Sequence, residues 1–196
     1  LVELVAGPAA DAGRLAALAD FADRRLGKGV VRAKDTPGFI ANRIGAFWIQ
    51  SAVNQAFAMG LRIEDADAVL GRPVGFPKTG VFGLLDLVGL DLIPQIAGSL
   101  LERLPEADPF RGEFREHLLI VRMIEQGLTG RKGAGGFYKL ERSGGGKTKL
   151  AVDLATGDYR VSEKRKLASV SAAKKGGLKS LVRHKEPAGQ YAWAVL

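Results

Sequence analysis

The first 34 residues combine short apolar runs with one amphipathic stretch. Residues 1–5 are rich in aliphatic and β-branched types before a Gly-Pro pair, which predicts a short strand ended by a turn. Apolar residues recur at spacings of three and four over 11–26, and Gly27 stands where a helix would end. A second short apolar run covers 30–33. The pattern therefore predicts strand, helix and strand.

From residue 35 onward the pattern is helical almost throughout. Thr36 can cap a helix in which Pro37 takes the first position. Residues 39–59 carry an apolar set too wide for one stripe, which predicts a helix buried by its own domain or by a partner subunit. Further helical patterns cover 63–70, 81–88, 92–104 and 113–126, and the Gly- and Pro-rich stretch 71–77 is typical of an irregular loop. The predicted fold class is mainly α.

Residues 141–196 differ in composition from the rest. They hold 12 basic and 5 acidic residues, whereas residues 1–140 hold 17 and 16, so most of the net charge of +8 lies in this tail. Its glycine run at 143–146 and its lysine-rich stretch at 163–185 are typical of a basic linker, interrupted by an alternating piece near 150–161. The basic stretch lacks interleaved aromatic residues, so a nucleic-acid partner is not expected.

Several function classes are excluded or disfavoured. The chain has no cysteine, and His117 and His184 have no recognisable catalytic partner nearby in sequence, so surface roles are expected for both and no metal site is expected. The stretch 141–148 ends like a phosphate-binding loop but has Glu141 in place of its first glycine, and no helix pattern follows. The pattern contains no membrane span or secretory signal, and a cytoplasmic location is expected.

Two polar residues stand out in apolar surroundings. Asn42 lies in the first turns of the longest predicted helix, where asparagine costs roughly half a kcal/mol relative to alanine, so a hydrogen bond should compensate it. This hydrogen bond could serve the fold or a functional site, and the sequence favours neither. Glu3 lies in the short apolar strand, where its carboxylate either faces solvent or orients a proton-transferring group.

Four ordered segments resemble one known family. Residues 34–43 read Lys-Asp-Thr-Pro-Gly-Phe-Ile-Ala-Asn-Arg, which is similar to the signature of the 3-hydroxyacyl-CoA dehydrogenase C-terminal domain. The further resemblances cover 71–77, 82–91 and 130–138. The family's fold is an N-terminal Rossmann domain that binds NAD, followed by a mostly helical domain that helps to bind the acyl-CoA and forms dimers. The chain begins with Leu1 rather than Met and is expected to be a fragment of a larger β-oxidation enzyme.

The resemblance implies a role for each segment. Residues 1–34 would be the end of the Rossmann domain, 35–140 the helical C-terminal domain, and 141–196 a linker with the possible start of a second helical domain at 189–196. Strand 1–5 would then lack its sheet neighbours and is expected to be displaced or paired with another chain. The 39–59 helix would carry a homodimer contact.

The resemblance also implies site residues. Glu3 corresponds to the acid that orients the catalytic histidine, which this chain lacks, and Asn42 to an active-site amide that polarises the substrate carbonyl. NAD would be bound by the missing N-terminal domain. The expected function is part of an NAD-dependent 3-hydroxyacyl-CoA dehydrogenase, inactive alone. Two alternatives stay open: a related 3-hydroxy-acid substrate, or a helical interaction module whose basic tail binds an acidic partner or nucleic acid.

Overall fold

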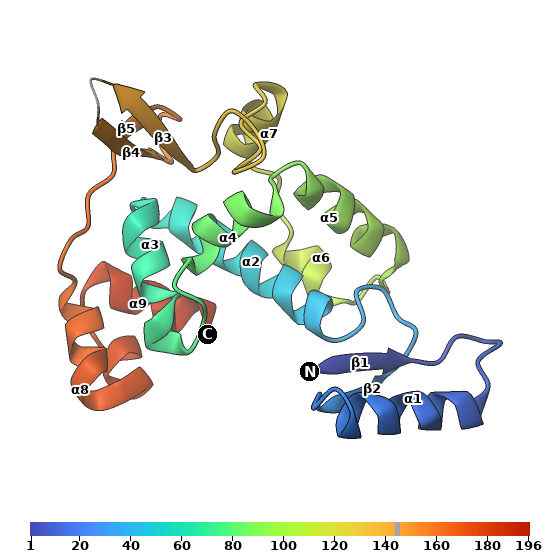
Figure 1. The fold of residues 1–196 in the computed structure, drawn as a ribbon. Helices are drawn as coiled ribbons and strands as arrows, with labels where there is room; N and C mark the ends of the chain where they lie inside the picture. The colour runs from blue at the N-terminus through green and yellow to red at the C-terminus, as the bar shows by residue number, and fades with distance from the viewer. Residues whose placement is uncertain (144–145) are drawn as a thin grey trace.

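The structure is a computed structural model that describes residues 1–143 and 146–196. Figure 1 shows a small N-terminal unit, residues 1–34, beside a larger body built mainly of helices. The elements are β1 (Val2–Val5), α1 (Ala12–Arg24), β2 (Val30–Ala33), α2 (Ala41–Ala58), α3 (Ile63–Val69), η1 (Arg72–Val74), α4 (Gly80–Val88), α5 (Leu92–Arg103), α6 (Pro109–Glu113), α7 (Leu118–Glu125), β3 (Tyr138–Ser143), β4 (Gly146–Val152), β5 (Tyr159–Val161), α8 (Ala168–Val182) and α9 (Pro187–Val195). The mainly α prediction is confirmed.

The N-terminal unit has the predicted strand-helix-strand order. β1 pairs with β2 in parallel, with Val2 beside Val30 and Val5 beside Ala33, and α1 makes the crossover. Asp11 caps α1 by accepting a hydrogen bond from the Arg14 N–H at 2.8 Å. The expectation that strand 1–5 is displaced is therefore wrong, because its ladder with β2 satisfies one edge, while its pairing with another chain stays a prediction. Its other edge has no strand neighbour among the described residues.

The entry to α2 differs from the prediction. Gly38 and Phe39 have φ values of 76° and 49°, so the chain makes a left-handed turn there and α2 begins only at Ala41. Thr36 donates from its hydroxyl to the Lys34 carbonyl and is not the helix cap. The second half of α2 is buried by its own domain, while its first half leaves Ile44 65% exposed.

The main core lies where α2, α3, α4 and α9 meet. Ala52, Ile63, Phe82 and Tyr191 are completely buried there. The Tyr191 hydroxyl donates to the Ala52 carbonyl at 2.9 Å, so the phenol is buried without losing its hydrogen bond. A smaller cluster under α5 and α6 is centred on Leu100 and Phe110.

The tail is folded, which corrects the prediction of a linker. β3, β4 and β5 form an antiparallel sheet, and α9, which was expected to open a second domain, packs against α2 and α3. Buried apolar side chains occur between the lysines and fasten the tail to the main core: Leu167, Leu181, Ala188 and Tyr191. Two residues of the glycine run, 144 and 145, lie outside the described part.

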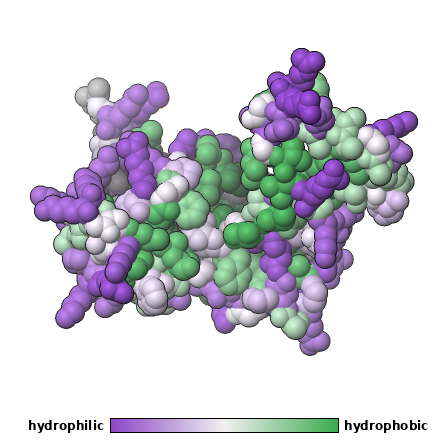
Figure 2. All heavy atoms as spheres, turned by 90° about the horizontal axis from the view of Figure 1, so that it is seen from below, coloured by the Kyte–Doolittle hydropathy of each residue, from purple (hydrophilic) through white to green (hydrophobic). Residues whose placement is uncertain are grey.

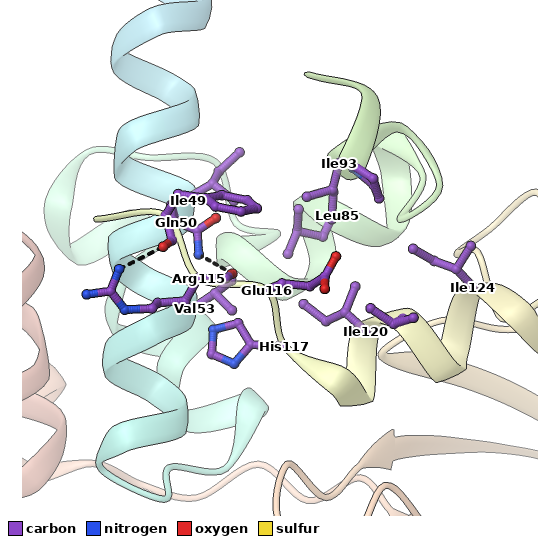
Figure 3. A pocket seen from close by; sticks show the side chains of 13 residues that line it. Ile49, Gln50, Val53, Leu85, Ile93, Arg115, Glu116, His117, Ile120 and Ile124 are labelled. Carbon is purple, nitrogen blue, oxygen red and sulfur yellow. Dashed lines mark hydrogen bonds between the residues drawn. The ribbon is translucent and has the colours of Figure 1, made fainter. Parts of the chain in front are cut away.

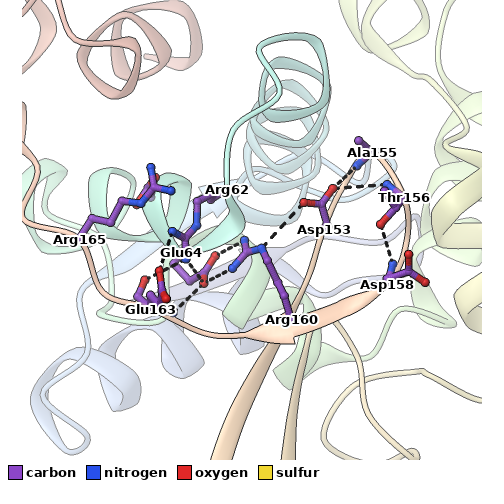
Figure 4. A network of polar contacts seen from close by, with 10 residues as sticks. Arg62, Glu64, Asp153, Ala155, Thr156, Asp158, Arg160, Glu163 and Arg165 are labelled. Atoms are coloured by element: carbon purple, nitrogen blue, oxygen red, sulfur yellow. Dashed lines mark hydrogen bonds and ion pairs between the residues drawn. The ribbon is translucent and has the colours of Figure 1, made fainter.

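An ion-pair network links the tail to α3 (Figure 4). The Arg160 guanidinium on β5 donates two hydrogen bonds of 2.7 Å to the two carboxylate oxygens of Glu64. Arg62 adds a bond of 3.0 Å to the same carboxylate, and the Glu163 N–H adds one of 3.1 Å. These donors hold the pKa of Glu64 at about 2, although burial by itself would raise it. The sheet is therefore tied to the helical body by charge as well as by apolar contact.

One further helical prediction needs a smaller correction. The helix expected over 113–126 begins only at Leu118, as α7, because residues 114–117 form an extended segment that follows α6. Within the described residues no single helix is long and apolar enough to cross a membrane; α4 and α5 pass that test only as a pair, and they are bent by 94°.

Candidate active site

The carboxylate of Glu3 binds the N-terminal end of α2. Its Oε1 accepts a hydrogen bond from the Ala41 N–H at 2.6 Å, and its Oε2 accepts one from the Ile40 N–H at 3.1 Å. A carboxylate at this position satisfies two orphan N–H groups and interacts favourably with the helix dipole. The left-handed Phe39 presents these N–H groups at a conformational cost of order 1 kcal/mol. Glu3 therefore joins β1 to α2 rather than pointing freely into solvent.

Asn42 lies next to this contact, in the first turn of α2. Its side chain is exposed and has no hydrogen-bond partner among residues 1–143 and 146–196. The expectation of a compensating hydrogen bond is therefore wrong for the chain as described. The structure does bring Asn42 and Glu3 to the same end of one helix, although they are far apart in sequence. The free amide of Asn42 is available to a ligand at that end.

An apolar groove of about 340 Å³ lies beside Glu3, between the strands and α2. Hydrophobic side chains gather across the middle of the molecule on the face shown in Figure 2. The rings of Trp48 and Phe76 pack at a tilt of 33°, with 4.5 Å between their centroids, and form part of the groove wall. The remaining lining is mostly aliphatic and includes Leu1, Val31, Ile40 and Ile44. This groove can hold an apolar chain close to the Glu3 carboxylate.

A second, smaller pocket of about 50 Å³ lies between α2, α4, α5 and α7 (Figure 3). Its walls are mainly aliphatic, with Ile49 and Val53 on α2 and Ile120 and Ile124 on α7. Gln50 and His117 add polar groups on one side.

His117 has an inward role that the sequence reading missed. Its ring stacks on Phe57 at 4.1 Å, and its Nε2 lies 2.8 Å from the Oδ1 of Asn54. Asn54 in turn donates to the Glu113 carbonyl at 2.7 Å and accepts from Gln50 at 2.9 Å. Burial lowers the pKa of His117. The surface role expected for this histidine is therefore wrong.

This polar cluster is separate from Glu3. Asn54 lies 13 residues after Ala41 on α2, which is about 20 Å along the helix axis. The structure therefore does not join His117 to Glu3 and Asn42. Gln50 and Asn54, four residues apart on an otherwise apolar helix, were the sequence signal for this polar cluster. His184 is also separate, since its Nδ1 accepts from the Glu186 N–H at 3.2 Å at the start of α9.

Two buried aspartates organise the loops around the core. Asp67 accepts hydrogen bonds from the Phe82 and Gly83 N–H groups and from the Tyr138 hydroxyl, at 2.7, 3.1 and 2.8 Å. Asp86 accepts from the Phe137 and Tyr138 N–H groups at 2.7 and 2.8 Å. Burial raises the pKa of Asp67 to about 7 and that of Asp86 to about 6. Their roles are structural, because every bond links two segments of the same core.

The fold and the Glu3 contact can now be compared with those of known proteins. This comparison identifies the class of protein to which the helical body belongs. The family described as "3-hydroxyacyl-CoA dehydrogenase, C-terminal domain" matches residues 38–140. The chain therefore belongs to the 3-hydroxyacyl-CoA dehydrogenase family and contains that C-terminal domain. The predicted family is confirmed.

Individual relatives give the same assignment. A Rickettsia prowazekii protein named for a trifunctional enzyme of the fatty acid oxidation complex is 40% identical over 74% of this chain and 20% of its own length. A Bacillus subtilis protein named as a 3-hydroxyacyl-CoA dehydrogenase is 35% identical over 100% of this chain and 25% of its own. The crystal structure of 3-hydroxybutyryl-CoA dehydrogenase from Escherichia coli K12 aligns with a TM-score of 0.60 at 28% identity, covering 72% of this chain and 29% of that one. The chain thus spans a quarter or less of the two sequence relatives.

Proposed function

We propose that this chain is the substrate-side helical part of an NAD-dependent 3-hydroxyacyl-CoA dehydrogenase that oxidises 3-hydroxyacyl-CoA to 3-oxoacyl-CoA in fatty-acid β-oxidation. In this proposal residues 1–34 are the end of the NAD-binding domain and residues 35–140 the helical domain. Both relatives named above carry fatty-acid oxidation or dehydrogenase names. The catalytic histidine belongs to a segment outside these residues, so the chain alone is inactive.

The observation that carries the proposal is the contact between Glu3 and the start of α2, directly beside Asn42. Each carboxylate oxygen of Glu3 uses one lone pair on a backbone N–H, which leaves acceptor capacity for an imidazole N–H. A histidine held in this way keeps one tautomer and gains stabilisation when it takes a proton from the 3-hydroxyl. Asn42 donates its amide hydrogen to the C3 oxygen, where negative charge develops.

The residues of the N-terminal unit do not form the NAD site. A dinucleotide pyrophosphate binds at a helix N-terminus that follows a glycine-rich turn. Here the N-terminus of α1 is already capped by the Asp11 carboxylate, which would repel a phosphate, and no G-x-G-x-x-G sequence precedes it. NAD, which accepts the hydride from C3, is therefore assigned to the part of the parent enzyme outside this chain.

The apolar groove supports the assignment of an acyl substrate. Its wall around Trp48 and Phe76 suits a hydrocarbon chain, and Glu3 lies at the same groove. Outside the lining of this groove, Phe39 and Phe47 are also exposed. We assign this surface to contact with the rest of the enzyme and with a second subunit in a homodimer. A cytoplasmic location accords with this assignment.

The test is oxidation of NADH with acetoacetyl-CoA. This chain is compared with a longer form that includes an N-terminal dinucleotide-binding domain, and with that form carrying Asn42→Ala or, as a control on an exposed amide, Gln190→Ala. Activity is expected only in the longer form, with a drop of about 100-fold in kcat for Asn42→Ala and none for Gln190→Ala. Equal thermal unfolding of the variants would show that folding is intact.

Three results would contradict parts of this proposal. Turnover by residues 1–196 alone would show that the chain is not an inactive fragment. A longer form that binds acyl-CoA but does not turn over would point to another 3-hydroxy-acid substrate. A longer form that binds neither acyl-CoA nor NAD would favour the alternative of a helical interaction module.

A further inference from the structure

A basic hollow lies where α8 packs against η1, and residues of both elements line it. Its volume is about 420 Å³. Three cationic side chains line it, and each comes from a different part of the chain: Arg72 from η1, Lys78 from the loop before α4, and Lys174 from α8. The hollow is distinct from the groove at Glu3.

Positive charge is in excess in this hollow, where three cations and one acidic residue form part of the lining. None of its three cations takes part in an ion pair within the described residues. The acidic residue of the lining is Asp67, whose carboxylate already accepts from Phe82, Gly83 and Tyr138. Three like charges around one hollow repel one another, and a bound anion converts that repulsion into attraction.

The loop that carries Arg72 and Lys78 is rigidly built. The Phe76 N–H donates to the Gly71 carbonyl and the Gly80 N–H to the Pro77 carbonyl, both at 3.1 Å. At Gly80, where φ is +65°, a Cβ would lie 2.4 Å from the Asp67 Cα, so only glycine allows the loop to approach α3 this closely. The two cations therefore rise from a fixed backbone, which lowers the entropy lost on binding.

The rest of the lining suggests which kind of anion fits. Pro73, Val170 and Ala173 form an apolar wall between the cations. Lysine and arginine bind phosphate oxygens, and an apolar wall accommodates a ring or an alkyl segment. We propose that the basic hollow binds the diphosphate group of a nucleotide-type small molecule.

Two sources could supply this diphosphate. One is the coenzyme A part of an acyl-CoA, and this source rests on the proposed function. The loop supports it, because Phe76 lines the groove at Glu3 while its neighbours Arg72 and Lys78 line the hollow. The other source is a free nucleoside diphosphate, which requires no dehydrogenase activity.

The test is calorimetric titration of this chain with ADP, coenzyme A and pantetheine, which lacks phosphates. Variants Arg72→Ala and Lys174→Ala remove one cation each. Lys179→Ala is the matched control, because Lys179 is an exposed lysine on the same helix that does not line the hollow. Binding of ADP or coenzyme A is expected to weaken about tenfold or more in the first two variants and less than about twofold in the control. Pantetheine is expected not to bind.

The outcomes show whether the hollow binds a diphosphate and which molecule supplies it. Tighter binding of coenzyme A than of ADP would support the hollow and identify the coenzyme, whereas equal binding would support it with a free nucleotide. Absence of binding at millimolar ligand, or equal weakening by Lys179→Ala, would overturn it, because the latter shows a diffuse charge effect. The activity of the longer form is measured separately, so failure here leaves the proposed function standing.

Discussion

The N-terminal unit and the helical body, α2 to α9, are stabilised in different ways. In residues 1–34 only Ala22 is buried, while Leu1 is 83% exposed and Leu18, Phe21 and Leu26 are each more than half exposed. In the body, many large side chains, Phe82 and Tyr191 among them, are completely buried. A unit of 34 residues with one buried side chain does not bury enough apolar surface to be stable alone.

The difference shows which interactions hold each part. The body has its own core, and its tail is fastened to that core by Tyr191 and by the ion pair between Arg160 and Glu64, so we expect it to unfold as one unit. Among the described hydrogen bonds, the N-terminal unit is joined to α2 by the Glu3 carboxylate. The unit should therefore open at much lower free energy than the body.

The largest expected difference between the two regions comes from replacing one phenylalanine by alanine in each. Phe82→Ala removes a completely buried ring that lies edge-on to Phe137 at 4.7 Å, and should lower the free energy of unfolding by about 3–5 kcal/mol. Phe21→Ala removes a ring that is 52% exposed on α1 and should cost under about 1 kcal/mol. Urea unfolding followed by circular dichroism measures both values. Similar losses in the two variants would show that the unit and the body share one core.

The next effect concerns the tail. Glu64→Ala leaves Arg160 without its two hydrogen bonds and should cost about 2–3 kcal/mol, below the full cost of breaking a buried pair because Arg160 keeps 27% exposure. Glu163→Ala is the control in the same network, and its side chain is 68% exposed, so a loss under about 1 kcal/mol is expected. Equal losses in urea unfolding would contradict the structural importance of Glu64.

The stabilisation that the Glu64 carboxylate provides should depend on pH. The pKa of Glu64 is about 2 in the folded chain against an ordinary 4.5, so its stabilisation is complete above pH 4.5 and is lost as the pH falls towards 2. Asp67 and Asp86 should change the stability in the opposite direction. Their pKa values are raised, so their ionisation in the folded chain lowers the free energy of unfolding as the pH rises above 3.8. Subtracting the pH profile of Glu64→Gln from that of the natural chain isolates the Glu64 contribution.

Local patterns predicted much of this fold and part of the site. Spacings of three and four residues located most helices, and the resemblance of residues 34–43 to the family signature pointed to Asn42. The left-handed turn at Phe39 was not readable, because a bulky residue rarely adopts a positive φ and nothing local marks it. The delayed start of α2, and with it the capping role of Glu3, depends on that turn.

Predictions about the tail and about His117 failed for a different reason. Composition averages a segment, so frequent lysines hid the few anchors, such as Leu181 and Tyr191, that decide whether the tail folds. The burial of His117 depends on Phe57 and Asn54, which lie about 60 residues earlier in the chain. Such long-range contacts leave no periodic signal.

The smallest expected effect, and the sharpest test of the comparison, is Glu3→Ala. The body should keep its free energy of unfolding, because Glu3 contacts only the exposed start of α2. Hydrogen exchange should become faster at the Ile40 and Ala41 amides and along β1, because both N–H groups lose their acceptor. Asp11→Ala is the control, since it removes a carboxylate cap from α1 and should speed exchange near Arg14 only. Unchanged exchange at Ile40 and Ala41 would show that Glu3 does not hold the N-terminal unit on the helix, and a lowered midpoint for the whole chain would show that the two regions fold as one.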